Sequence, residues 1–224
     1  MSDFVQETQQ DLEKLIHSGE SDNALEKINS ILNSKTLAKE KRMDYLILKV
    51  KALTRSDQYF HAMNLLNEIE KDILKLGNDF HQIDFYQYKA ENLFVFGKAT
   101  SAMEILESAE NIIEGISKDD SIIVIHKKID LLVLKSELIS HIHGFTEKLH
   151  EVLELCLELC NETDYEFGKA KTYERMAKSF KERGEREKAI ECTEEAFLIW
   201  ERLRNRYGIG YTTLIKGRLQ IFNY

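Results

Sequence analysis

Three cationic side chains recur at helical spacing in the C-terminal third of the sequence, and together they could bind carboxylates. Lys171, Arg175 and Lys178 stand at i, i+4 and i+7, which places them on one face of a helix. The guanidinium of Arg175 has the geometry for bidentate hydrogen bonds to a carboxylate. The pattern predicts an anchor for acidic groups of a partner. The alternative is a solvated helix face on which Glu174 and Lys178 form an ordinary i,i+4 ion pair.

Other reactive residue types lack the spacing of a catalytic or metal site. His141 and His143 are two positions apart, so on a helix their imidazoles would diverge by about 200°. Cys156 and Cys160 share a helical face, and we expect inert core thiols rather than a redox or metal pair. The segment GKAT at 97–100 lacks the upstream glycine of a phosphate-binding loop. We therefore predict no enzyme activity, no cofactor and no metal site.

The composition is that of a globular protein with an acidic surface. Of 224 residues 43% are apolar, which is enough to bury a substantial core. The 31 basic and 39 acidic residues give a formal net charge of −8, which disfavours generic nucleic-acid binding. Three sparse cysteines favour a reducing compartment. Since neither a signal peptide nor a long uncharged stretch occurs, we expect a cytoplasmic protein that does not bind membranes.

Proline is absent, although an average chain of this length would carry roughly ten at about 5% usage. Nothing in the sequence therefore interrupts helices internally, and glycine together with Asn, Asp and Ser must end them. No linker rich in Pro, Gly or Ser divides the chain. We expect one all-α domain that spans residues 1–224.

A two-helix pattern recurs along this domain. In one copy, at 173–196, apolar and small residues form one stripe on each of two helices, and Gly184 stands between the helices. The segment at 86–109 repeats the same residue types at the same offsets, 87 residues earlier. Small residues at facing positions let two antiparallel helices approach closely. We therefore expect four alanines to be buried, namely Ala90, Ala102, Ala177 and Ala189.

Weaker copies of the pattern extend it to five helix pairs and one last helix. The pairs are expected at about 4–36, 43–76, 83–116, 121–161 and 167–204, and the last helix at 208–223. The fourth pair would begin with a longer first helix, at about 121–142, whose seven additional residues correspond to two helical turns. The last helix would cap the stack by covering the apolar face of the preceding pair.

The repeated unit resembles the tetratricopeptide repeat in its version of roughly 40 residues. With the unit numbered so that Ala177 is position 8, the resemblance lies in a small residue at 8, an aromatic residue at 11, glycine near 15, alanine at 20 and a small residue at 27. It lies also in the segments GKAKTY (168–173) and GIGYTT (208–213). It implies a right-handed α-α superhelix that binds a peptide segment or a partner helix in a concave groove, without catalysis. No proline follows the second helices and no tryptophan stands in the first helices. A different all-helical solenoid or a helical bundle is the alternative fold.

In such a superhelix the first helix of each pair lines the groove. This register predicts the following partner-binding residues: Lys51, Arg55, Gln87, Tyr88, Glu91, Phe94, Lys171, Glu174, Arg175, Lys178 and Tyr211. The cations among them favour a protein or peptide partner with acidic segments. For the aromatic residues Tyr88 and Phe94, packing against neighbouring helices is the alternative.

Two other functions fit the same sequence. The chain could be a sensor module whose superhelix changes pitch on binding a peptide or a small ligand. It could also be a structural homo-oligomer, since the apolar segment at 219–224 could join two copies at their C-terminal ends.

Overall fold

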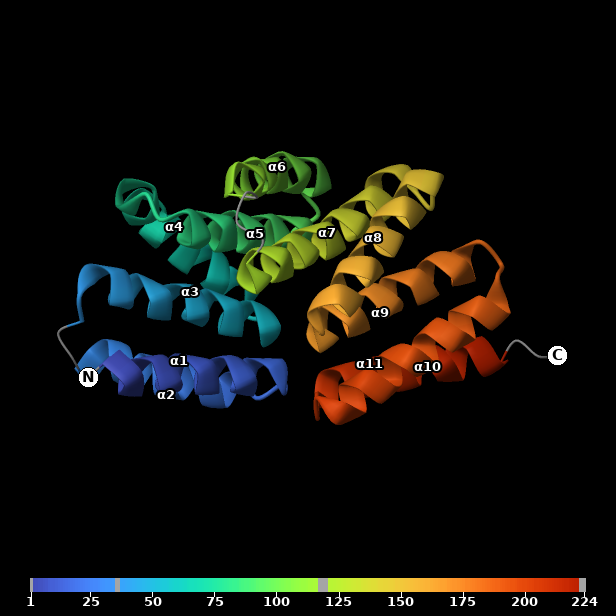
Figure 1. Ribbon diagram of the computed structural model, residues 1–224, viewed down its shortest axis with the longest axis horizontal. Helices are drawn as coiled ribbons and strands as arrows, with labels where there is room; N and C mark the ends of the chain where they lie inside the picture. The colour runs from blue at the N-terminus through green and yellow to red at the C-terminus, as the bar shows by residue number, and fades with distance from the viewer. Residues whose placement is uncertain (1, 35–36, 117–120, 222–224) are drawn as a thin grey trace. The chain divides into compact units, whose positions relative to one another are not determined.

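The computed structural model is all-helical, as the sequence predicts (Figure 1). It describes residues 2–34, 37–116 and 121–221, and within these ranges it contains eleven α-helices and no strand. The helices are α1 (Ser2–His17), α2 (Ser21–Ser34), α3 (Lys39–Arg55), α4 (Tyr59–Leu76), α5 (Asp79–Val95), α6 (Ala99–Ile116), α7 (Ile122–His143), α8 (Glu147–Thr163), α9 (Glu166–Glu182), α10 (Arg186–Arg202) and α11 (Arg206–Ile221). In the described part of the chain, none of these helices is both long and apolar enough to cross a membrane.

Two sequence-based expectations about these helices are confirmed. The longer helix expected at about 121–142 is α7, which has 22 residues. The four alanines Ala90, Ala102, Ala177 and Ala189 are all buried. Their small side chains permit the close contacts between helices that the repeated pattern predicts.

Glycine ends helices at the turns where the sequence predicts it. Gly97 and Gly184 follow α5 and α9 with φ of +75° and +77°, a backbone conformation that glycine adopts without steric cost. Asp57 occupies the corresponding turn after α3, with φ of +59°. At the end of α5, backbone hydrogen bonds from Gly97 to the carbonyl of Phe94 and from Lys98 to that of Leu93 close the helix. These turns reverse the chain within a few residues, so consecutive helices pack side by side.

The chain divides into two compact units, residues 1–112 and 113–224. In the first unit, α1 contacts α2 and α3, and α3 contacts α4 and α5. Two apolar clusters result from these contacts. One is built around Leu12, Ile28 and Tyr45, and the other around Leu66 and Phe85; all five side chains are buried. Removal of this apolar surface from water stabilises the packing.

In the second unit, α7 contacts α8 and α9, and α10 contacts α9 and α11. Its centre is Trp200 on α10, of which only 1% is exposed. Phe167 packs edge-on against the indole with ring centroids 5.2 Å apart. The backbone of α11 reaches the indole at Gly208, where an added Cβ would lie 2.4 Å from Trp200 Cδ2. Glycine at this position therefore sets how closely α11 approaches α10.

Candidate functional site

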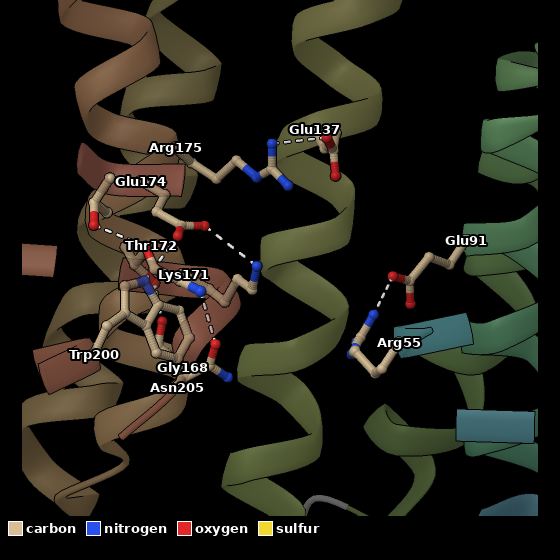
Figure 2. Close-up of polar contacts among 12 residues, drawn as sticks. Arg55, Glu91, Glu137, Gly168, Lys171, Thr172, Glu174, Arg175, Trp200 and Asn205 are labelled. Carbon is tan, nitrogen blue, oxygen red and sulfur yellow. Dashed lines mark hydrogen bonds and ion pairs between the residues drawn. The ribbon is translucent and has the colours of Figure 1, made fainter. Parts of the chain in front are cut away.

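The three cations of the predicted anchor differ in their contacts within the chain, and Figure 2 shows those of Lys171 and Arg175. Lys171 Nζ lies 3.2 Å from Glu174 Oε2, and Arg175 Nη1 lies 2.7 Å from Glu137 Oε1 on α7. Lys178 is exposed, and it has no ion-pair partner among the described residues. Of this stripe, Lys178 is thus the cation that remains open to a partner's carboxylate.

Glu174 lies in the interior, although the repeat register predicts it in the groove. Only 3% of it is exposed, and Glu174 Oε1 accepts a hydrogen bond of 2.8 Å from Trp200 Nε1 (Figure 2). Its other oxygen faces Lys171, whose Nζ also lies 5.5 Å from the centroid of the Trp200 ring. A buried indole N–H needs an acceptor, and this carboxylate supplies it. The i,i+4 pair with Lys178 that the sequence offers as an alternative is replaced by this arrangement.

Arg175 joins two first helices of the second unit. Its partner Glu137 stands where the tetratricopeptide pattern would have a small residue. Both side chains are largely buried, with 18% of Arg175 and 24% of Glu137 exposed. Such a pair is costly to break on one side only, because the remaining charge would stay buried. The guanidinium of Arg175 is therefore engaged in a contact between two helices of its own chain.

In the first unit, Arg55 on α3 and Glu91 on α5 form an ion pair (Figure 2). These two predicted partner-binding residues therefore neutralise each other's charge. The third predicted residue of this region, Lys51, is half-buried. Burial, followed by the positive charges of Lys51 and Arg55, lowers the pKa of His17 to about 3. His17 lies at the end of α1 and is not part of the repeat pattern. The sequence therefore does not indicate that it is buried beside two cations.

The depressed pKa of His17 predicts a loss of stability on acidification. His17 is neutral in the folded chain, while the unfolded chain binds a proton below its ordinary pKa of 6.5. The stability that the neutral ring confers is fully present above pH 6.5. It is lost as the pH falls from 6.5 toward the pKa of about 3 in the folded chain. Between about pH 7 and about pH 5 we expect His17 to account for a loss of about 2 kcal/mol in the free energy of unfolding. Urea unfolding of parent and His17→Gln at both pH values measures it.

His61 provides the control for this prediction, because it is an exposed histidine of the same unit. His61→Gln should retain the acid sensitivity of the parent, whereas His17→Gln should reduce it. An equal pH dependence in parent and His17→Gln would contradict the assignment.

The remaining predicted residues of the first unit face inward to different degrees. Gln87 and Tyr88 are buried, and Tyr88 packs in the apolar cluster that contains Leu66 and Phe85. For Tyr88 the alternative of packing against neighbouring helices therefore holds. Phe94 is half-buried. Helices α3 and α5 contact each other, and Tyr88 of α5 packs with residues of α3 and α4 in this cluster.

A shallow depression of about 150 Å³ lies between α9 and α11. It is lined by Lys178, Lys181, Glu182, Tyr211, Leu214, Ile215 and Arg218. The depression thus brings together two predicted partner-binding residues, Lys178 and Tyr211. Burial raises the pKa of Tyr211, so its hydroxyl stays protonated and can donate a hydrogen bond. The repeat register does not indicate Lys181, Leu214 or Arg218, because their place in the depression depends on the contact between two helices.

The charges around this depression are mainly positive. Three cations, Lys178, Lys181 and Arg218, stand against the single carboxylate of Glu182. Lys181 Nζ lies 3.4 Å from that carboxylate in an exposed pair. Arg218, like Lys178, is exposed and has no ion-pair partner in the part of the chain that the structure describes. The apolar Leu214 is 52% exposed beside these charges.

The histidines that end α7 lie at the surface, whereas the cysteines of α8 lie in the interior. His141 and His143 are exposed at the end of α7, before Gly144, and His150 Nε2 is 3.1 Å from Glu154 Oε1. Cys156 and Cys160 are buried, as predicted for core thiols. Burial raises the pKa of the Cys160 thiol to about 12, and that of Cys156 rises further for the same reason.

The C-terminal segment proposed for a homodimer is described only in part. Leu219 is buried, and its carbonyl accepts a hydrogen bond from Arg186 Nη2. Residues 222–224 lie outside the described residues. Leu219 therefore packs within its own chain.

Comparison with known proteins adds no family to these observations. No protein-family model matches the sequence, and no curated protein matches it. The function must therefore be argued from the geometry of the chain.

Proposed function

We propose that this chain is a non-catalytic protein-interaction module that holds an acidic peptide segment against its first helices. The observation that carries the proposal is the depression between α9 and α11, where Lys178 and Arg218 surround apolar side chains. Neither cation has an ion-pair partner in the described part of the chain. The chain as a whole is acidic, with a formal net charge of −8. A local excess of positive charge on an acidic protein favours acidic partners.

The same proposal includes a tetratricopeptide-like arrangement of the helix pairs. Two observations support it. Within each unit a first helix contacts its own second helix and the next first helix, as α3 does with α4 and α5 and as α7 does with α8 and α9. In addition, the alanines at the equivalent small positions are buried. Such nesting aligns first helices along one face.

The lining of the depression specifies what the segment must carry. One aliphatic or aromatic side chain would lie on Leu214, Ile215 and Tyr211, and neighbouring Asp or Glu side chains would face Lys178 and Arg218. Burying one such apolar side chain contributes about 1.5–3 kcal/mol, whereas an exposed ion pair contributes about 0.2–1 kcal/mol. The apolar contact therefore supplies most of the local affinity, and the cations supply the preference for acidic sequences.

Selection of peptides from a display library with the full chain tests this function. We expect enrichment of sequences with an apolar residue next to Asp or Glu. For a selected peptide, Lys178→Glu replaces an attraction by a repulsion, so the affinity should fall about tenfold. Fluorescence anisotropy measures this change, and circular dichroism should show an unchanged melting temperature.

Lys148→Glu is the matched control, because Lys148 is an exposed lysine on the second helix α8. It makes the same charge change outside the depression and should leave the affinity near that of the parent. Failure to enrich any peptide would refute the proposed function. Equal losses in Lys178→Glu and Lys148→Glu would refute the proposed site.

A further inference from the structure

A second and larger depression, of about 460 Å³, lies within the first unit between α2, α3 and α4. Its volume is in the range of ligand-binding clefts. Leu25 of α2 and Leu53 of α3 form its floor, and both are buried. The depression is bordered by the second helices α2 and α4, whereas the site proposed above lies between α9 and α11. It therefore constitutes a separate candidate site.

Three side-chain amides line this depression. Asn29 projects from α2 and Asn64 from α4, while Gln58 precedes α4. In the described part of the chain, the amides of Asn29 and Asn64 make no hydrogen bond within the protein. Gln58 Nε2 donates a hydrogen bond to Ser56 Oγ at 3.2 Å. Each carboxamide offers both a donor and an acceptor, the combination that a peptide main chain also presents.

The charges and length of the depression select among ligands. Lys49 and Glu68 contribute one charge of each sign, so the lining has no excess charge for a phosphate or another strong anion. Along α4 the lining runs from His61 to Glu68, which is about 10 Å at 1.5 Å per residue. An extended chain of about three residues covers this length at roughly 3.3 Å per residue. A neutral, extended main chain fits both properties.

We propose that this depression binds the main chain of a short extended peptide segment, about three residues long, through the amides of Asn29, Asn64 and Gln58. Recognition through main-chain groups depends little on the peptide's side chains. The apolar floor of Leu25 and Leu53 accepts small aliphatic groups between the amide contacts. The first unit would then hold a segment independently of the acidic preference proposed for the second unit.

Nuclear magnetic resonance of the full, ¹⁵N-labelled chain tests this proposal, with N-acetyl-trialanine amide as the probe. We expect the side-chain NH₂ signals of Asn29, Asn64 and Gln58 to shift on titration to about 10 mM, because three residues bind with an affinity on the order of 1 mM. Loss of one hydrogen-bonding amide contributes about 0.5–1.5 kcal/mol, so Asn64→Ala should weaken binding roughly threefold to tenfold. Asn67→Ala, an exposed position on the same helix outside the depression, is the matched control and should bind as the parent does.

Two further probes give outcomes that would overturn the proposal. A peptide with N-methylated amides cannot donate main-chain hydrogen bonds, so equal shifts with that peptide would exclude main-chain recognition. Shifts with inorganic phosphate but not with the blocked peptide would identify an anion site instead. Absence of any shift in the three amide signals would also refute the proposal. Because Lys178→Glu leaves this unit unaltered, an unchanged titration in that variant separates this proposal from the acidic-peptide function.

Discussion

Replacement of Gly208 by alanine is expected to lower the free energy of unfolding by about 2 kcal/mol. The new Cβ would lie 2.4 Å from Trp200 Cδ2 and 2.5 Å from Trp200 Cγ, closer than unstrained atoms approach. Overpacking of this kind costs about 1–3 kcal/mol, and we expect the upper end because the indole is held in place by Glu174. Alanine regains about 1 kcal/mol through its higher helix propensity. Urea unfolding followed by the fluorescence of Trp200, the single tryptophan, measures the difference.

Gly210 provides a control two residues further along α11. Apart from neighbouring residues and the backbone of its own helix, no atom of the described residues lies within 4 Å of a Cβ built there. Gly210→Ala should therefore raise the free energy of unfolding by about 0.5–1 kcal/mol. The two substitutions are chemically identical and should have opposite signs. Destabilisation by Gly210→Ala to the same extent would show that contact with the indole is not the reason for glycine at 208.

The helices themselves could be predicted from the sequence because their signals are local. Apolar and small residues at helical spacing mark the buried stripes, and Gly97 and Gly184 mark the turns. The length of α7 follows from the wider spacing of the pattern around it. The stripes and turns depend on residues within a few turns of each other, and the length of α7 depends on the spacing between copies of the pattern. The sequence therefore predicts them without knowledge of which helices meet.

The candidate site could be predicted only in part because its properties depend on pairs of helices. Two residues that the register predicts for partner binding, Lys178 and Tyr211, line the depression between α9 and α11. It does not indicate that Arg55 is neutralised by Glu91 or Arg175 by Glu137, since each pair joins two different helices. The sequence pattern around a charged residue on the outer face of a helix is the same whether its side chain faces solvent or an opposite charge on another helix. Only the tertiary contacts decide between these outcomes.

Replacement of Glu174 by leucine is expected to lower the free energy of unfolding by about 2–4 kcal/mol. The variant leaves Trp200 Nε1 without its acceptor in the interior, and an unsatisfied buried donor costs about 1–3 kcal/mol. Lys171 loses its ion-pair partner as well, and its Nζ would remain beside the indole ring. Urea unfolding at neutral pH measures the loss.

Glu174→Gln separates the hydrogen bond from the charge. The glutamine carbonyl can still accept from Trp200 Nε1, so the variant should lose about 1 kcal/mol or less, chiefly from the pair with Lys171. Because the carboxylate lies inside the chain, Glu174→Gln should also bind a selected acidic peptide with the affinity of the parent. Equal destabilisation by leucine and glutamine would show that the indole does not depend on this acceptor. If Glu174→Gln changed the affinity for the peptide, Glu174 would be part of the binding surface, as the repeat register predicts.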